Sequence, residues 1–199
     1  RLMADYTTAA AVKTYLHITT GTDDALIGEL VTRASRLIDD QTGRWFQART
    51  ETRRYSTSGA HLSGAILLLD AALLAVTAID NGSGDAIDPT QDVILRPLNM
   101  PPYFGVSIRA TTGKVWTSAP DDLIAITGEW GYSATPPEVI EQAATRLAAW
   151  LYRQRDTGTA APTLEVDARG VLAAPPRLPW DILQMLTPYT RIRVKAGAA

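Results

Sequence analysis

Hydrophobic and polar positions along the chain follow two different periods. Between residues 22 and 42, apolar side chains recur every three or four positions, which is typical of an amphipathic helix. The stripe consists of Leu26, Ile27, Leu30, Val31, Ala34, Leu37 and Ile38. Residues 8–16 and 136–156 show the same spacing. The pattern therefore predicts helices at about 8–16, 22–42 and 136–156.

Residue types at the ends of these stretches support the helices. Thr22 or Asp23 can accept hydrogen bonds from the first backbone N–H groups of the second helix, and Gly43 suits a left-handed C-terminal cap. Pro136 and Pro137 open the third helix, where the first turn has no N–H bond to lose.

Short apolar runs dominate the chain from about residue 45 to 132. The runs AILLL, AVTAID and DVILR are separated by clusters of Gly, Pro, Asn and Asp, which is the pattern of strands and turns. Residues 1–157 are thus predicted to form one domain, a small helical bundle with a β-rich insertion at about 45–132. The expected fold class is α+β, mainly α.

The C-terminal part, residues 158–199, has a different composition. It is rich in Ala, Pro and Thr at first, as in an extended linker, and a short helix is predicted at about 179–186. Trp180, beside prolines, is predicted to contact another chain. The stretch YTRIRVKAGAA alternates apolar and basic residues like a half-buried strand, and the edge of such a strand can be paired by another chain.

Composition narrows the class of protein. A length of 199 residues fits a single domain with appendages, and 46% hydrophobic with 20% charged residues is typical of a folded chain. A net charge of −2 argues against a surface that coats nucleic acid through many phosphate contacts. The absence of cysteine fits a reducing compartment such as the cytoplasm.

No stretch predicts a membrane anchor or a secretion signal. The most hydrophobic window, residues 65–76, is split by Asp70 and is shorter than the roughly 20 apolar residues that a membrane-spanning helix needs.

Residue types that carry catalysis are sparse and scattered. His17 and His61 have no ligand or triad partner in sequence spacing, and residues 80–85 (DNGSGD) lack the lysine and the following helix of a phosphate-binding loop. Neighbouring carboxylates on a helix diverge by about 100°, so the first two of the acidic pairs do not converge on a metal ion, and the third pair fits a turn before a strand. The pairs are Asp23 with Asp24, Asp39 with Asp40 and Asp121 with Asp122. We expect no catalytic residue, no metal and no cofactor.

Three blocks of sequence, taken in their order and spacing, resemble a known family. The first block combines Tyr6, Val12, Lys13, Tyr15 and Leu16 with DDALIGEL and TGRWF; the second is AVTAIDNG; the third is GEWGY, PP and LAAWLYRQRD. Together they resemble the head–tail connector proteins, also called adaptor or head-completion proteins, of long-tailed bacteriophages, prophages and gene transfer agents.

This resemblance implies a structural virion protein and no enzyme. Twelve copies would form a ring beneath the portal protein, link the DNA-filled capsid to a downstream neck or tail protein, and let DNA pass through the lumen without sequence-specific binding. The protein would assemble in the host cytoplasm and reside in the neck of the virion. The residues implied to face the portal are Trp180, Leu183, Tyr189, Arg191, Ile192, Arg193 and Val194.

Three other functions compete with the connector. A stopper or tail terminator would lack the paired N-terminal helices and be mainly β. A nucleic-acid-binding module would bind DNA tightly with a steep salt dependence. An enzyme, such as a hydrolase with scattered carboxylates, would lose turnover when one aspartate is replaced by alanine.

Overall fold

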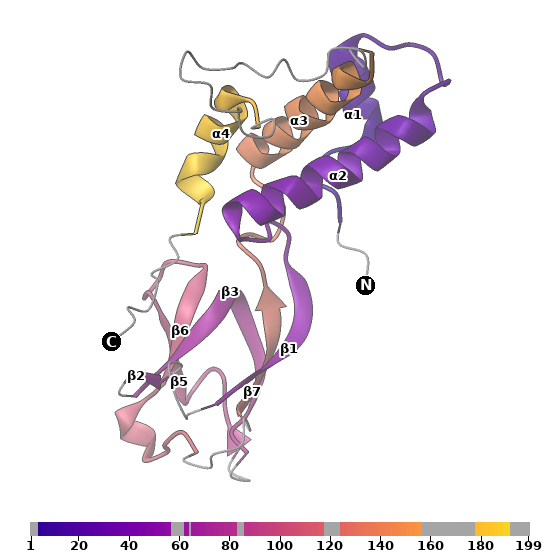
Figure 1. Ribbon diagram of the computed structural model, residues 1–199. Coiled ribbons are helices and arrows are strands. Elements are labelled where there is room, and N and C mark those ends of the chain that lie inside the picture. Colours follow the sequence, from indigo (N-terminus) through magenta and orange to yellow (C-terminus); the bar gives the residue numbers. More distant parts are fainter. Residues whose placement is uncertain are drawn as a thin grey trace, which may run out of the picture. The chain divides into compact units, whose positions relative to one another are not determined.

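The computed structural model describes residues 4–56, 62–63, 65–82, 86–117, 124–156 and 178–191. Within these ranges the chain divides into two units, which are described separately below (Figure 1). The helical unit combines residues 4–43, 136–156 and 178–191, and the β unit takes its residues from 44–135. The predicted linker, apart from residues 178 and 179, and the C-terminal strand beyond residue 191 lie outside the described residues.

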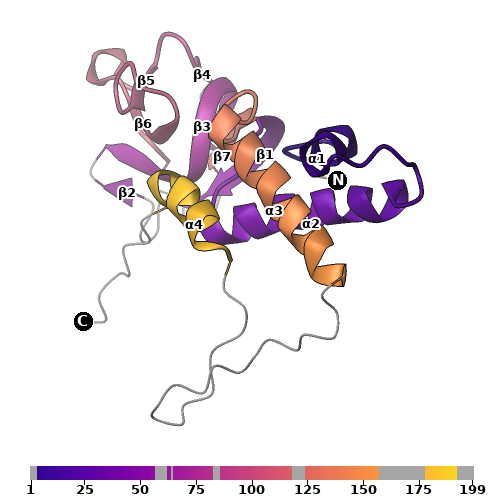
Figure 2. The ribbon, with the colours of Figure 1, turned by 90° about the horizontal axis from the view of Figure 1, so that it is seen from above.

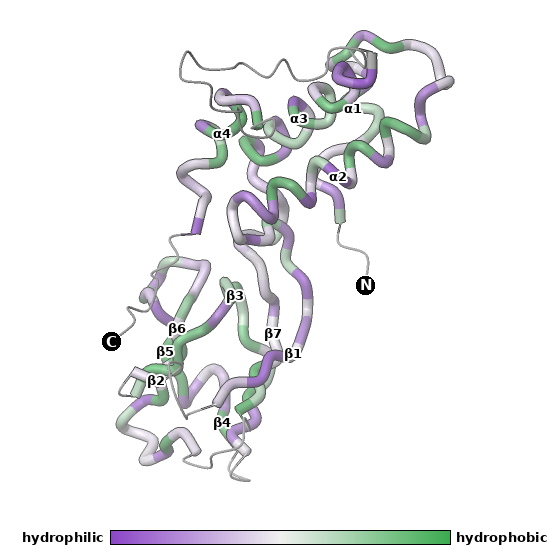
Figure 3. Tube along the Cα trace, in the orientation of Figure 1, coloured by the Kyte–Doolittle hydropathy of each residue, from purple (hydrophilic) through white to green (hydrophobic). Residues whose placement is uncertain are grey.

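The helical unit contains four described helices. They are α1 (Ala9–Leu16), α2 (Asp24–Thr42), α3 (Glu138–Asp156) and α4 (Trp180–Leu186), which is followed by the 3-10 turn η2 (Thr187–Tyr189). Within this unit α3 packs against each of the other three helices (Figure 2). Apolar and polar residues alternate along α2 with helical period (Figure 3), and its buried face includes Ile27, Val31, Ala34 and Ile38.

The ends of α2 show one prediction confirmed and one that is wrong. Gly43 adopts the left-handed conformation with φ 63°, and its N–H donates to the carbonyl of Asp39 at 2.8 Å. Asp23 stands at the N-cap position, but its side chain makes no capping hydrogen bond. The Asp23 carboxylate instead binds side chains of α3, as described below.

The β unit is built around one antiparallel sheet. Its main path runs β1-β7-β3-β6-β5, and the two-residue strands β2 and β4 pair with β3 at the side of this path. The strands are β1 (Arg49–Tyr55), β2 (Leu62–Ser63), β3 (Ile66–Asp80), β4 (Ala86–Ile87), β5 (Val93–Arg96), β6 (Tyr103–Ile108) and β7 (Ile124–Trp130); a 3-10 turn, η1 (Ala110–Thr112), follows β6.

Strand β3 belongs to both halves of this sheet. Its first part pairs with β6 and its second part with β7, and Leu73 is the residue at which the two pairings meet. The register shifts between Leu73 and Ala75 and again between Val76 and Ala78. At this irregular stretch Gly128 of β7 approaches β3 so closely that a Cβ atom on it would lie 2.2 Å from the carbonyl oxygen of Ala75.

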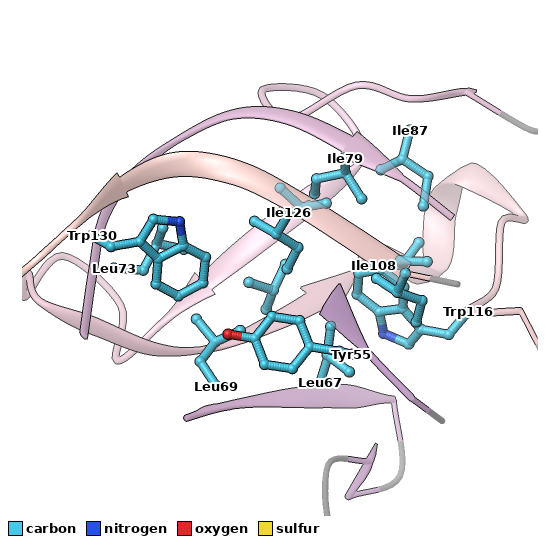
Figure 4. Packing of buried hydrophobic residues seen from close by; sticks show 13 residues of the cluster. Tyr55, Leu67, Leu69, Leu73, Ile79, Ile87, Ile108, Trp116, Ile126 and Trp130 are labelled. Atoms are coloured by element: carbon cyan, nitrogen blue, oxygen red, sulfur yellow. The ribbon is translucent and has the colours of Figure 1, made fainter. Parts of the chain in front are cut away.

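The β unit has a hydrophobic core of its own. Tyr55 lies beside Leu67 and Leu69, and Trp130 lies near Leu73 (Figure 4). All buried residues of this cluster come from the β unit; they are Tyr55, Leu67, Leu69, Leu73, Ile79, Ile87, Val93, Val106, Ile108, Trp116, Ile124, Ile126 and Trp130.

The predicted fold class, mainly α with a β-rich insertion in a helical bundle, is wrong in its balance. Among the described residues 28% are in strands and 39% are helical, and the antiparallel sheet is a layer with its own core. Because Asp70 divides the apolar run 66–80, the sequence pattern predicts this run as two short strands and understates the sheet. In the structure it forms the 15-residue strand β3.

Candidate interaction surfaces

The short helix α4 is held on the helical unit by two buried side chains and by contacts with an arginine of α3. Ile182 and Leu186 are each only 1% exposed. Arg146 of α3 forms an ion pair with Asp181, and its Nη1 also lies 3.7 Å from the sulfur of Met185. These contacts fix which face of α4 is turned away from α3.

The chain after α4 returns to the end of α2. The backbone N–H of Thr187 donates to the carbonyl of Leu183, which continues the helical bonding into η2, and the Thr187 hydroxyl donates to the same carbonyl at 2.8 Å. The backbone N–H of Arg191 then donates to the carbonyl of Thr42 at 2.8 Å. Residue 191, the last one described, is therefore fixed beside the C-terminal turn of α2.

Trp180 is the exposed aromatic residue of this surface. Its side chain is 74% exposed although tryptophan buries more apolar area than other side chains when it is covered. Of the other residues that the resemblance places opposite the portal, Leu183, Tyr189 and Arg191 are half-buried on the same segment. Ile192, Arg193 and Val194 lie outside the described residues, so four of the seven predicted positions are described, all on the segment from α4 to residue 191.

A groove lies between the C-terminal halves of α2 and α3. Its volume is about 430 Å³. The apolar lining is made by Leu37, Trp150, Leu151 and Leu178, and the polar lining by Asp40, Gln41 and Gln154. The four apolar residues are only half-buried, so an apolar surface is left in contact with water. Sequence patterns did not predict this groove, because its two walls are more than 100 positions apart in the chain.

The aspartate pair on α2 is split between two roles. Asp39 is 8% exposed; it accepts a hydrogen bond from the Tyr6 hydroxyl and forms an ion pair of 2.9 Å with Arg36. The Tyr6 backbone N–H donates to the Ser35 hydroxyl at 3.0 Å. Asp40, the next residue, is exposed on the groove. The pair does not converge on a common ligand, as its spacing on a helix predicts.

Asp23 joins the start of α2 to the end of α3. The Tyr152 hydroxyl donates to its carboxylate at 2.5 Å, and Arg155 contributes an ion pair of 3.0 Å. These two partners hold the pKa of Asp23 below its ordinary value.

On the β unit, arginines stack on aromatic rings beside the edge strand β1. The guanidinium of Arg49 lies 3.6 Å from the ring centre of Trp45, and that of Arg53 lies 4.9 Å from the same ring. Arg53 also binds Asp70 at 2.7 Å, and the Tyr55 hydroxyl donates to Asp70 at 2.6 Å. Burial, together with this hydrogen bond, raises the pKa of Tyr55. The acid that divided the apolar run is thus bound by two side chains from β1.

Other candidate residues have structural roles or fall outside the described ranges. His17 ends α1 in the left-handed conformation with φ 59°. His61, Asp121 and Asp122 are not described. In the described part of the chain, no three His, Cys, Asp or Glu residues are grouped so that they could hold a metal ion. No helix there is long and apolar enough to cross a membrane.

These elements define a fold in which helices α2 and α3 pack together, while the strands of an antiparallel sheet lie between them in the sequence. No protein-family model and no curated protein matches the chain. Solved structures that share its fold include two with 18% sequence identity. One, "Neck of empty GTA particle computed with C6 symmetry", has a TM-score of 0.59 and covers 95% of this chain and 91% of its own. The other, "Neck of native GTA particle computed with C12 symmetry", has a TM-score of 0.58 with 98% and 96% covered.

These matches extend over nearly the whole of each chain, so they include both the helices and the sheet. The protein shares its fold with chains in the neck of gene transfer agent particles, in agreement with the resemblance found in the sequence.

Proposed function

We propose that the protein is a ring-forming head–tail connector of the adaptor type, a structural subunit that docks under a portal protein and links a DNA-filled capsid to the neck or tail. The observation that carries the proposal is the shared fold over 95% and 98% of the chain with neck structures of sixfold and twelvefold symmetry. A subunit that acts by assembly needs surfaces for its neighbours and no catalytic centre.

The paired helices favour an adaptor over a stopper or a tail terminator. Those alternatives were expected to be mainly β and to lack the N-terminal helices, whereas α1 and α2 are both present and pack on α3. The sheet, larger than the sequence predicted, offers strand ends and loops for contacts with a downstream component.

The exposed face around α4 is the proposed portal contact. It includes Trp180, which has the properties of an interface anchor: a large aromatic side chain that is exposed in the isolated subunit and carried on a helix fixed by buried residues. Leu183, Tyr189 and Arg191 would extend this contact, followed in sequence by Ile192, Arg193 and Val194.

DNA is proposed to pass through the lumen of the ring without sequence-specific binding. The net charge of −2 supports a weak interaction with the phosphate backbone. A measurement of DNA affinity against salt would separate this proposal from a nucleic-acid-binding module, which requires tight binding with a steep slope.

Native mass spectrometry of the purified protein, alone and mixed with the portal protein of its own particle, tests the proposal. We expect a complex with the portal that contains about twelve copies of the 21.5 kDa subunit, visible as a ring by electron microscopy. A chain that stays monomeric with the portal present would refute the proposal, as would particles that join tails to filled capsids without this protein.

A further inference from the structure

The groove between α2 and α3 combines an apolar floor with an acidic rim. Leu37, Trp150 and Leu151 form the floor, and Asp40 stands at the edge of it. Among the described residues, no ion pair involves Asp40, and its side chain is exposed. An extended segment that carries apolar and basic residues in alternation would match both properties.

The described chain stops next to this groove. The N–H of Arg191 is bonded to the carbonyl of Thr42, and Thr42 directly follows Gln41, which lines the groove. Four extended residues span up to about 13 Å. The rise of α2 from Leu37 to Thr42 is about 7.5 Å. Residues 192–195 are therefore long enough to run along the floor from the position where residue 191 is fixed.

The sequence of these residues has the required chemistry. Ile192 and Val194 alternate with Arg193 and Lys195, so an extended segment presents its two apolar side chains to one side and its two cations to the other. Apolar side chains on the floor would remove the half-buried leucines and Trp150 from water. The cations would lie at the rim near the carboxylate of Asp40, which gives charge complementarity.

We propose that residues 192–195 of the chain dock into the groove between α2 and α3 of the same chain in the free subunit. The segment is the one that the proposed function assigns to partner contact, so docking shelters it until assembly offers a larger surface. Assembly then has to displace the segment from the groove, and the free subunit is restrained from premature association. The inference rests on the helical unit alone and is tested without portal or ring, so its failure would leave the proposed function standing.

Disulfide trapping tests the docking directly, because the chain contains no cysteine. The paired variant Gln41→Cys with Val194→Cys places one thiol at the groove and one on the segment. The matched control pairs Val194→Cys with Glu29→Cys, a position that is exposed on α2 and does not line the groove. Both proteins are oxidised at low concentration and digested, and the cross-linked peptides are identified by mass spectrometry.

We expect an intrachain disulfide in the groove pair and little in the control pair. Adding Asp40→Lys to the groove pair should lower the yield about two- to fivefold, as expected for the loss of one exposed ion pair. Equal yields in the two pairs would overturn the proposal. A disulfide that forms only between two chains would overturn it as well, because the occupant would then be the segment of a second copy.

Discussion

Gly128 gives the sharpest test of the fold, because the space around it is closed by backbone. In the substitution Gly128→Ala, the new Cβ would lie 2.2 Å from the carbonyl oxygen of Ala75 and 3.2 Å from a methyl group of Leu73. The carbonyl cannot rotate away without breaking the pairing of β3 with β7. Overpacking of this kind costs about 2–3 kcal/mol of unfolding free energy.

Urea unfolding followed by tryptophan fluorescence measures this cost, since Trp130 is buried in the same core. With a slope of about 2 kcal/mol per molar urea, the midpoint should fall by about 1 M or more. Gly28→Ala is the matched control: nothing lies within 4 Å of its Cβ position on α2, and alanine in a helix is favoured over glycine by about 0.5–1 kcal/mol. A Gly128→Ala midpoint equal to that of the unchanged protein would refute the close approach of β7 to β3.

Three further substitutions test the helical unit, the bonds between Asp70 and strand β1, and the proposed portal contact. Tyr6→Phe removes the hydroxyl that donates to buried Asp39, and should lower the free energy of unfolding in urea by about 1–3 kcal/mol. An unchanged free energy of unfolding would show that this hydrogen bond does not stabilise the fold. Although burial alone would raise the pKa of Asp70, its tyrosine and arginine partners hold this pKa below its ordinary value. The carboxylate therefore stabilises the fold above about pH 4 and loses this effect as the pH falls through its folded-state pKa. Asp70→Asn should cost about 1 kcal/mol at pH 7, since half of the side chain meets water, and should flatten the acid branch of a stability–pH curve; an unchanged branch would contradict the reasoning. Trp180→Ala should change the free energy of unfolding by no more than about 0.5 kcal/mol but should weaken binding to the portal in a titration. The control Tyr15→Ala, at another exposed aromatic residue, should leave portal binding unchanged. If both substitutions weaken portal binding equally, Trp180 is not a specific part of the contact.

Local patterns predicted the helices well and the sheet only in part. The apolar stripe and the glycine cap of α2 are properties of neighbouring residues, so periodicity alone led to residues 22–42, and α2 spans Asp24–Thr42. The same kind of pattern fails at Asp70, where it predicts two short strands instead of the single strand β3. The partners of Asp70, Arg53 and Tyr55, are 17 and 15 positions away in sequence, and no local pattern shows that an acid inside an apolar run will be paired.

The candidate surfaces also include some features that neighbouring residues predict and others that arise only when distant residues pack together. The position of Trp180 beside prolines led to the prediction that it contacts another chain, and the structure shows that the residue is exposed. Its partner is still a prediction. The groove could not be predicted, because Leu37 and Trp150 become neighbours only when α2 and α3 pack together. The link from Tyr6 to Asp39 was missed for the same reason, since its two residues are 33 positions apart.

Strand β3 also affects how the β unit comes apart. One uninterrupted backbone supplies hydrogen bonds to β6 along its first part and to β7 along its second. Local unfolding that starts in either half of the sheet therefore disturbs β3, the strand with which the other half is paired. Amide protons of β6 and β7 should thus exchange with solvent in one cooperative step, although the two strands pair with different parts of β3.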